Sequence, residues 1–312
     1  MTTNRDRMQT LLGGGIPDVP PTWEIAFYIH DEYFGGWPSP DPAHMSEHEN
    51  SGQWSTAFQI LERCVEEFGY GAIRGGYDHE ECAFIKKRIG DRALVVGYEG
   101  GGVFWMPNGE DMMDFAVGLY EKPEEIQDEA RRKCDMAKES FRRLVDAGAD
   151  LLLGTWDFGY NNAPFVSPDK FAEIVTPYMA ELADCAHGLG RKLIVHSDGC
   201  LNHILDQIHG TGIDGYQSVD PQGHMDIKAV RERYPDWILM GNVACNMLQD
   251  TDETKIRESV RYCMKHGGIG KPYIFSTSNC VYKGMPPESY RIMLDEYRTL
   301  CDAAQAKVAP TA

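Results

Sequence analysis

Short apolar runs alternate with longer polar segments over most of the chain, and this alternation predicts the secondary structure. Runs such as Leu151–Leu153 and Leu193–Val195 are typical of strands buried on both faces. The segment that opens with Pro123 and two glutamates has a good helix start. Strands are expected at residues 20–28, 70–74, 93–98, 149–154, 193–195, 214–218, 237–243 and 273–277. Helices are expected at 4–12, 54–68, 109–119, 123–147, 168–189, 200–211, 225–233, 252–266 and 287–304.

This order of elements predicts an α/β fold. Strands that alternate with helices form right-handed βαβ units, and such units build a parallel sheet. Eight predicted strands in 312 residues fit a (β/α)8 TIM barrel better than an open sheet. Because such barrels reach this length as one unit, we expect a single domain over residues 1–312. Residues 1–20 would form a helical and loop extension at its N-terminus.

One long segment, residues 29–55, has no regular pattern and is rich in aromatic and polar side chains. Long loops in compact domains are usually functional or disordered, and the aromatic content argues against disorder. We therefore predict a lid or pocket wall. His30, His44 and His48 lie in it without a metal-binding motif, so a role in a substrate pocket or on the surface is favoured for them.

Composition and charge narrow the classes of function. An apolar fraction of 42% and a charged fraction of 25% are ordinary for a globular enzyme. A net charge of −18 argues against nucleic acid or an anionic membrane as partner, because both need clustered Lys and Arg. No apolar run approaches the ~18–20 residues of a spanning helix. The N-terminus has no apolar core like that of a signal peptide, so a cytoplasmic protein is expected.

Polar side chains gather where the predicted strands end, and catalytic residues of a (β/α)8 barrel lie at those C-terminal ends. Each of these residues also has an ordinary structural explanation, such as a turn or a helix cap. The pattern nevertheless repeats over five successive units, so we expect the side chains to converge on one face. They are Glu24, Asp157, His196, Asp198, Gln217, Asp220, Asn242 and the segment 276–280.

Three of these side chains could hold a metal ion. His196, Asp198 and Cys280 offer an imidazole, a carboxylate and a thiolate from the fifth and eighth predicted strands. Three protein ligands and an open fourth position are the arrangement of catalytic zinc, and a cysteine ligand favours zinc over magnesium or calcium. Cys200 and Glu24 are alternative ligands. The nine cysteines have no disulfide-like spacing, which favours free thiols, and a loop thiol without function explains Cys280 almost as well.

Several motifs resemble the uroporphyrinogen decarboxylase superfamily and, within it, the corrinoid-dependent methyltransferases. The motifs are Arg5-Asp6-Arg7 to Asp18-Val19-Pro20, Gly118-Leu119-Tyr120 with Pro123-Glu124, Pro164 to Pro168, His196 to Gly199, Asp220-Pro221, Gly241-Asn242-Val243 and Ser276 to Asn279. The resemblance implies a (β/α)8 barrel with a zinc site made by a His-x-Cys pair and a distant cysteine. His196 and Cys280 match the first and third ligands. Asp198 stands at the second, and its oxygen is acceptable to zinc.

The resemblance implies a zinc-dependent methyltransferase that moves a methyl group between a small O-methyl or N-methyl compound and a corrinoid (cobalamin). Zinc would act as a Lewis acid on the heteroatom or thiol concerned. The corrinoid-binding signature Asp-x-His-x-x-Gly is absent from the sequence, so the corrinoid is expected on a separate partner protein. A homodimer is compatible with this hypothesis.

Two alternatives stay open. A metal-free decarboxylase of this superfamily needs arginines near the first strand, but Glu24 and Asp31 stand there instead and would repel a polycarboxylate. A non-catalytic barrel that binds a small molecule would keep the fold and lose the metal ligands. Under the methyltransferase hypothesis, the predicted catalytic residues are Asp157, Asn161 and Glu24. Asp157 and Asn161 would orient the substrate or protonate the leaving group, and Glu24 would complete the polar floor of the site. The predicted substrate-binding residues are Tyr28, His30, Trp37, Gln217, Asp220, Asn242 and Tyr282.

Overall fold

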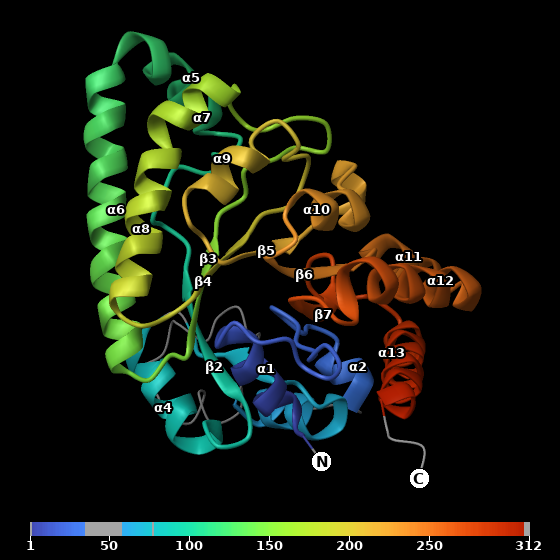
Figure 1. The fold of residues 1–312 in the computed structure, drawn as a ribbon. Helices are drawn as coiled ribbons and strands as arrows, with labels where there is room; N and C mark the ends of the chain where they lie inside the picture. The colour runs from blue at the N-terminus through green and yellow to red at the C-terminus, as the bar shows by residue number, and fades with distance from the viewer. Residues whose placement is uncertain (1, 35–57, 77, 309–312) are drawn as a thin grey trace.

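Seven parallel strands form one curled sheet in the computed structural model, which describes residues 2–34, 58–76 and 78–308 (Figure 1). The strands follow one another in chain order across the sheet, as consecutive βαβ units require. They are β1 (Ala72–Arg74), β2 (Leu94–Glu99), β3 (Leu151–Thr155), β4 (Leu193–His196), β5 (Gly215–Ser218), β6 (Ile238–Val243) and β7 (Tyr273–Thr277).

Almost every strand residue is buried, as the uninterrupted apolar runs predict. Because all strands are parallel, their C-terminal ends meet at one end of the sheet. The register places His196 directly beside Gln217 of the next strand. Paired residues point to the same face of a sheet, so these two side chains lie together at the end where polar residues were expected.

Helices cover the outside of the curled sheet, and α6 and α8 lie side by side along β2 to β4 (Figure 1). The helices are α1 (Asn4–Leu12), α2 (His30–Phe34), α4 (His79–Ile89), α5 (Met112–Glu121), α6 (Pro123–Asp146), α7 (Pro168–Ile174), α8 (Thr176–Gly188), α9 (Leu205–Gly210), α10 (Ile227–Arg233), α11 (Cys245–Asp250), α12 (Glu253–Cys263) and α13 (Pro287–Val308). Shorter helical turns are η2 (Cys64–Phe68), η3 (Pro221–Gly223) and η4 (Met264–Gly268), and residues 58–63 are also helical.

The predicted first strand is not a regular strand. Residues 20–28 form two isolated parallel bridges, at Thr22 and at Phe27, to β7 and the loop after it. The Thr22 carbonyl also accepts a hydrogen bond of 2.9 Å from the N–H of Gly71, just ahead of β1. Two consecutive prolines at the start of the segment have no N–H to donate. In the described residues the sheet therefore has seven strands rather than eight, with this segment between its two edges.

Several helix predictions needed correction. The expected helix 168–189 is two helices that meet at Val175, because Pro177 in an unbroken helix would clash with the preceding turn. The helix expected at 200–211 begins only at Leu205, and α11 was not predicted. Within the expected lid, α2 accounts for the first residues, while 35–57, and Trp37 with them, lie outside the described residues.

One buried arginine ties α10 to the loops around it. Arg231 is 5% exposed and donates to the carbonyl oxygens of Trp237 at 2.7 Å and Pro272 at 2.6 Å. It also reaches the carbonyls of Tyr234, Pro235 and Gly267. Burial lowers the pKa of its guanidinium to about 10, so it stays charged at neutral pH.

None of the helices in the described part of the chain is long and apolar enough to cross a membrane.

Candidate metal centre

His196 is the last residue of β4, and only one of its two imidazole nitrogens is hydrogen-bonded among the described residues. The side chain is 9% exposed, and its Nδ1 atom is hydrogen-bonded to Oε1 of Gln217, its neighbour across the sheet. The Nε2 atom lies 3.6 Å from Oδ1 of Asp157 and 3.9 Å from Oδ2 of Asp198. No hydrogen bond from the described residues reaches Nε2. The unbonded imidazole nitrogen therefore faces two carboxylates.

The two carboxylates are fixed by neighbours from three strand ends. The backbone N–H of Asp198 donates to Oδ1 of Asp157 at 3.1 Å. The Ser218 hydroxyl donates to Oδ1 of Asp198 at 2.6 Å, and the Asn279 side-chain amide donates to its Oδ2. These bonds orient both acids toward the imidazole of His196.

Glycines allow the loops after β3, β4 and β5 to pack backbone against backbone. Gly199 has a φ of +81°, and a Cβ there would lie 2.2 Å from the carbonyl oxygen of Gly159. A Cβ on Gly223 would lie 2.2 Å from the carbonyl carbon of Gly199. Gly199 has both the positive φ and the close approach, and Gly223 has the close approach. Only glycine tolerates these conditions, so these positions bring the three strand ends within reach of one another.

The donor set fits a divalent cation. The ligand atoms of Asp157, His196 and Asp198 all lie within 4.8 Å of one another. Ligand atoms around a tetrahedral zinc, bound at ~2.0–2.1 Å, would lie roughly 3.4 Å apart, close to the two distances found. Burial raises the pKa of Asp198, while His196 and the Ser218 hydroxyl lower it and the carboxylates of Asp157 and Asp220 raise it. One imidazole and two carboxylates suit zinc, and also manganese or iron.

The three ligands adjoin an open cleft at the C-terminal end of the sheet. The cleft unites four residues that the sequence singled out: Asp157, Asn161, Asp198 and Asp220. Its described lining contains neither Lys nor Arg. The described residues that line it are Met106, Asp157, Gly159, Tyr160, Asn161, Asn162, Asp198, Gly199, Asp220 and His224. Asp220 also caps η3, since its carboxylate accepts hydrogen bonds from the N–H groups of Gln222 and Gly199.

Gln217 and Asn242, two predicted substrate ligands, are bonded to the protein instead of lining this cleft. Gln217 is fully buried between His196 and the loop after β7. The Asn242 amide donates to the carbonyl oxygen of Val219 at 2.9 Å, and the thiol of Cys263 donates to its Oδ1 at 3.1 Å. Both side chains therefore connect neighbouring strand ends by hydrogen bonds.

Cys280, a predicted zinc ligand, lies beside the site without joining the ligand group found among the described residues. It directly follows Asn279, whose side chain holds Asp198. Burial raises the pKa of its thiol, and Cys245, Asp198 and Glu24 raise it further. The Cys245 thiol, which sequence analysis did not single out, donates to the Cys280 carbonyl oxygen at 3.7 Å. Cys280 therefore stays a predicted ligand, placed close by.

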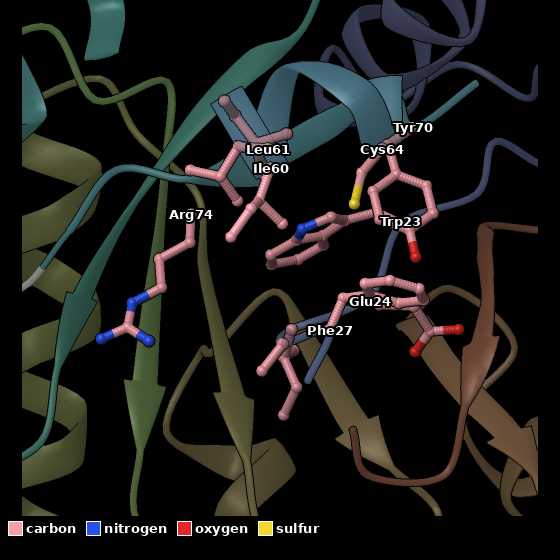
Figure 2. Close-up of a pocket in the computed structure, with 11 residues that line it drawn as sticks. Trp23, Glu24, Phe27, Ile60, Leu61, Cys64, Tyr70 and Arg74 are labelled. Atoms are coloured by element: carbon pink, nitrogen blue, oxygen red, sulfur yellow. The ribbon is translucent and has the colours of Figure 1, made fainter. Parts of the chain in front are cut away.

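Glu24 lies in a different pocket, lined mostly by apolar side chains (Figure 2). Among the residues that the structure describes, none lines both this pocket and the cleft. The residue is 3% exposed, and its carboxyl group accepts hydrogen bonds from the Thr277 N–H at 3.0 Å and hydroxyl at 2.6 Å. Burial raises its pKa to about 8, so the group is mostly protonated at pH 7. Figure 2 shows Glu24 and Arg74 on opposite sides of the Trp23 indole.

The remaining predicted pocket residues lie away from the cleft lining. Tyr28 donates its backbone N–H to the carbonyl oxygen of Val281 at 2.7 Å. His30 is buried, and its Nδ1 atom lies 3.1 Å from Oδ1 of Asp31. Tyr282 is partly buried in the loop after β7. Tyr28 belongs to the N-terminal segment that bridges the sheet edges, His30 follows this segment, and Tyr282 follows Val281, which pairs with it. The roles of these three residues in substrate binding stay predictions.

A comparison with family models identifies the chain. The model for uroporphyrinogen decarboxylase (URO-D) matches residues 74–300, which include every strand end described above. The chain belongs to the uroporphyrinogen decarboxylase family. The resemblance inferred from the motifs is thereby confirmed at the level of the family, and the curled parallel sheet agrees with a TIM-barrel-like fold.

Individual members and neighbours of the family are distant in sequence. The uroporphyrinogen decarboxylase of Salinibacter ruber is 24% identical over 249 residues, which cover 75% of this chain and 66% of that protein, just under two thirds of its length. A methyltransferase from Methanosarcina mazei superposes with a TM-score of 0.74 at 16% identity, over 96% of this chain and 99% of that one. An amidohydrolase gives a TM-score of 0.50 at 12% identity, over 93% and 74% of the two chains. These structural similarities show a common fold.

Proposed function

We propose that this protein transfers a methyl group between a small methylated substrate and a corrinoid carried by a separate protein, with zinc held by Asp157, His196 and Asp198. The observation that carries the proposal is the unbonded Nε2 atom of His196, which faces two carboxylates at the wall of an open cleft. Membership of the URO-D family and the fold shared with a methyltransferase support it.

In this proposal the protein side chains prepare the site. Bound zinc would act as a Lewis acid, making the heteroatom that carries the methyl group a better leaving group or keeping an accepting thiol deprotonated. Asp157 and Asp198 would balance its charge, and Asn161 at the cleft rim would orient the substrate by hydrogen bonding. Glu24 stays a predicted catalytic residue, although it lies in a pocket separate from the cleft.

The charge of the cleft favours methyl transfer over decarboxylation of a polycarboxylate. Asp157, Asp198 and Asp220 line the cleft, and no Lys or Arg among the described lining residues offsets them. A substrate with several carboxylates would meet repulsion there, whereas a neutral or cationic methylated compound would not. A barrel that only binds a small molecule remains an outcome of the experiment below.

We further propose that residues 1–312 form one cytoplasmic domain, with the segment 20–28 at the place of the eighth barrel strand. The bridges of this segment to β7 and its hydrogen bond from Gly71 support a closed barrel. The partner protein with its corrinoid would approach from the C-terminal end of the sheet, where the cleft opens.

Metal content, measured by elemental analysis after dialysis, tests the proposal first. We expect about one zinc per chain in the wild type, and loss of the metal in His196→Ala and Asp157→Ala. His187→Ala is a matched control, because His187 also pairs with an aspartate, Asp214 at 2.8 Å, but at the other end of the sheet. That variant should retain the metal.

Methyl transfer is then measured with free cobalamin, which removes the need for the partner protein. We expect transfer from a methylated donor to cob(I)alamin by the wild type, and none by His196→Ala. A wild-type protein that binds no metal would contradict the proposed site. Metal binding without methyl transfer for any O-methyl, N-methyl or S-methyl donor would instead support a binding barrel.

A further inference from the structure

The amide of Gln217 has two polar neighbours, and together they determine which way it points. Gln217 is fully buried beneath the metal centre. Its Nε2 atom donates to the backbone carbonyl oxygen of Asn279 at 3.4 Å, and its Oε1 atom meets Nδ1 of His196. A carbonyl oxygen can only accept hydrogen bonds. The reverse orientation would place two oxygens face to face, so the amide nitrogen must point to Asn279.

The orientation of this amide decides the tautomer of His196. Because Oε1 of Gln217 can only accept, the hydrogen of the neutral imidazole must reside on Nδ1. The Nε2 atom then carries the lone pair, and it is this atom that faces Asp157 and Asp198. A histidine that binds a metal through one nitrogen usually donates the other N–H to a fixed acceptor.

Asn279 connects the same arrangement to the second ligand. While its backbone carbonyl orients Gln217, its side-chain amide donates to Oδ2 of Asp198. The Ser218 hydroxyl holds the other oxygen of Asp198 at 2.6 Å. Ser218 and Val219 both adopt positive φ values, +109° and +48°, and a β-branched residue there is strained. Strain at the end of β5, beside the ligands, is typical of a functional site.

We propose that Gln217 is a positioning residue, which fixes His196 with its Nε2 lone pair directed at the metal before any metal binds. The inference rests on the proposed metal centre for its function, but the tautomer itself does not depend on metal. It replaces the predicted role of Gln217 in substrate binding, since a fully buried side chain with both amide atoms engaged cannot also contact a substrate in the cleft.

The tautomer can be read directly in the metal-free protein. In protein labelled with ¹⁵N at histidine, the protonated and the lone-pair nitrogen of a neutral imidazole resonate far apart, and His196→Ala identifies the signals of His196. We expect Nδ1 protonated and Nε2 unprotonated in the wild type, in chelator-treated protein at a pH where the imidazole is neutral. A wild-type His196 protonated at Nε2 would overturn the proposal without any variant.

Two variants separate positioning from mere packing. Gln217→Leu removes the acceptor, and we expect mixed tautomers together with a 10- to 100-fold weaker Zn²⁺ affinity, measured by chelator competition. Gln217→Glu keeps an acceptor for Nδ1–H, and in its protonated form the second oxygen can donate to the Asn279 carbonyl in place of the amide, so the tautomer should be retained and the affinity should lie within a few-fold of the wild type. Unchanged tautomer and affinity in Gln217→Leu would contradict the inference. If the wild type shows the expected tautomer but binds no Zn²⁺, the proposed function fails while Gln217 still orients His196.

Discussion

The Nε2 atom of His196 and Oδ1 of Asp157 lie 3.6 Å apart, across the ends of two neighbouring strands. This separation is too long for a hydrogen bond, yet it is close to the spacing of two ligands on one metal ion. His196 is the last residue of β4, and Asp157 lies two residues beyond β3. The pair therefore indicates a site shaped for a cation between the two side chains.

Replacement of Cys280 by alanine distinguishes the two candidate ligand sets. If Asp157, His196 and Asp198 hold the metal, Cys280→Ala should keep about one zinc per chain. The cobalt-substituted protein should also lack a thiolate-to-cobalt absorption band. Loss of the metal in Cys280→Ala, or a thiolate band in the wild type that disappears in the variant, would show that Cys280 is a ligand, as the sequence predicts.

The pH dependence of stability should reveal the buried carboxyl of Glu24. Its pKa is raised from 4.5 to about 8 by burial, so the folded protein keeps the proton while the unfolded chain loses it. The stabilisation is complete below pH 4.5 and is lost as the pH rises to about 8. The free energy of unfolding should fall in this range by up to about 1.4 kcal/mol per pH unit.

Glu24→Gln does not titrate and should lack this decrease. Urea unfolding of wild type and variant at pH 5.5 and pH 8 tests the expectation, and the variant should gain stability relative to the wild type at the higher pH. Glu124→Gln, on the exposed start of α6, is the control and should follow the wild type. Parallel curves for Glu24→Gln and wild type would mean that Glu24 ionises normally in the folded protein.

Gly199→Ala should damage both stability and the metal centre. Alanine at a φ of +81° is strained by ~1–2 kcal/mol, and its Cβ would meet the Gly159 carbonyl at 2.2 Å. We expect a loss of roughly 2 kcal/mol or more in the free energy of unfolding and weaker Zn²⁺ binding. Gly188→Ala in α8, where a Cβ meets nothing within 4 Å, should be neutral. Equal effects of the two variants would refute the argument from loop packing.

Arg231→Ala should be among the most destabilising single substitutions on the helical layer. It would remove the guanidinium donor from five backbone carbonyl groups, of which those of Tyr234 and Pro272 keep a backbone N–H donor, at a cost of about 3 kcal/mol or more in the free energy of unfolding. Arg233→Ala on the same helix removes an exposed pair with Asp206 and should cost about 1 kcal/mol or less. Urea denaturation of both variants compares the two. A small effect of Arg231→Ala would indicate that water replaces the lost donor.

The sequence by itself determined the order of elements and the chemistry of the strand ends. Apolar runs long enough to be buried on both faces define the seven strands, because burial of that surface drives folding whatever the partner. The polar residues that follow the strands, above all His196 and Asp198, could be predicted because the change from apolar to polar residues at a strand end lies within a few consecutive residues. Where local chemistry competes with pairing, as at the prolines before Thr22, the prediction of a regular strand was wrong.

Only the tertiary structure decided which of these polar residues meet. Asp157 lies beside His196 and Asp198 because glycines allow the neighbouring loops to contact each other. Gln217 lies beside His196 because of the register between β4 and β5, which cannot be deduced from the spacing of residues in the sequence. The same three-dimensional packing places Glu24 in a separate pocket and allows the Asn279 side chain to donate a hydrogen bond to Asp198. Contacts between residues far apart in the chain depend on how the whole sheet curls, and local sequence patterns carry no record of that curvature.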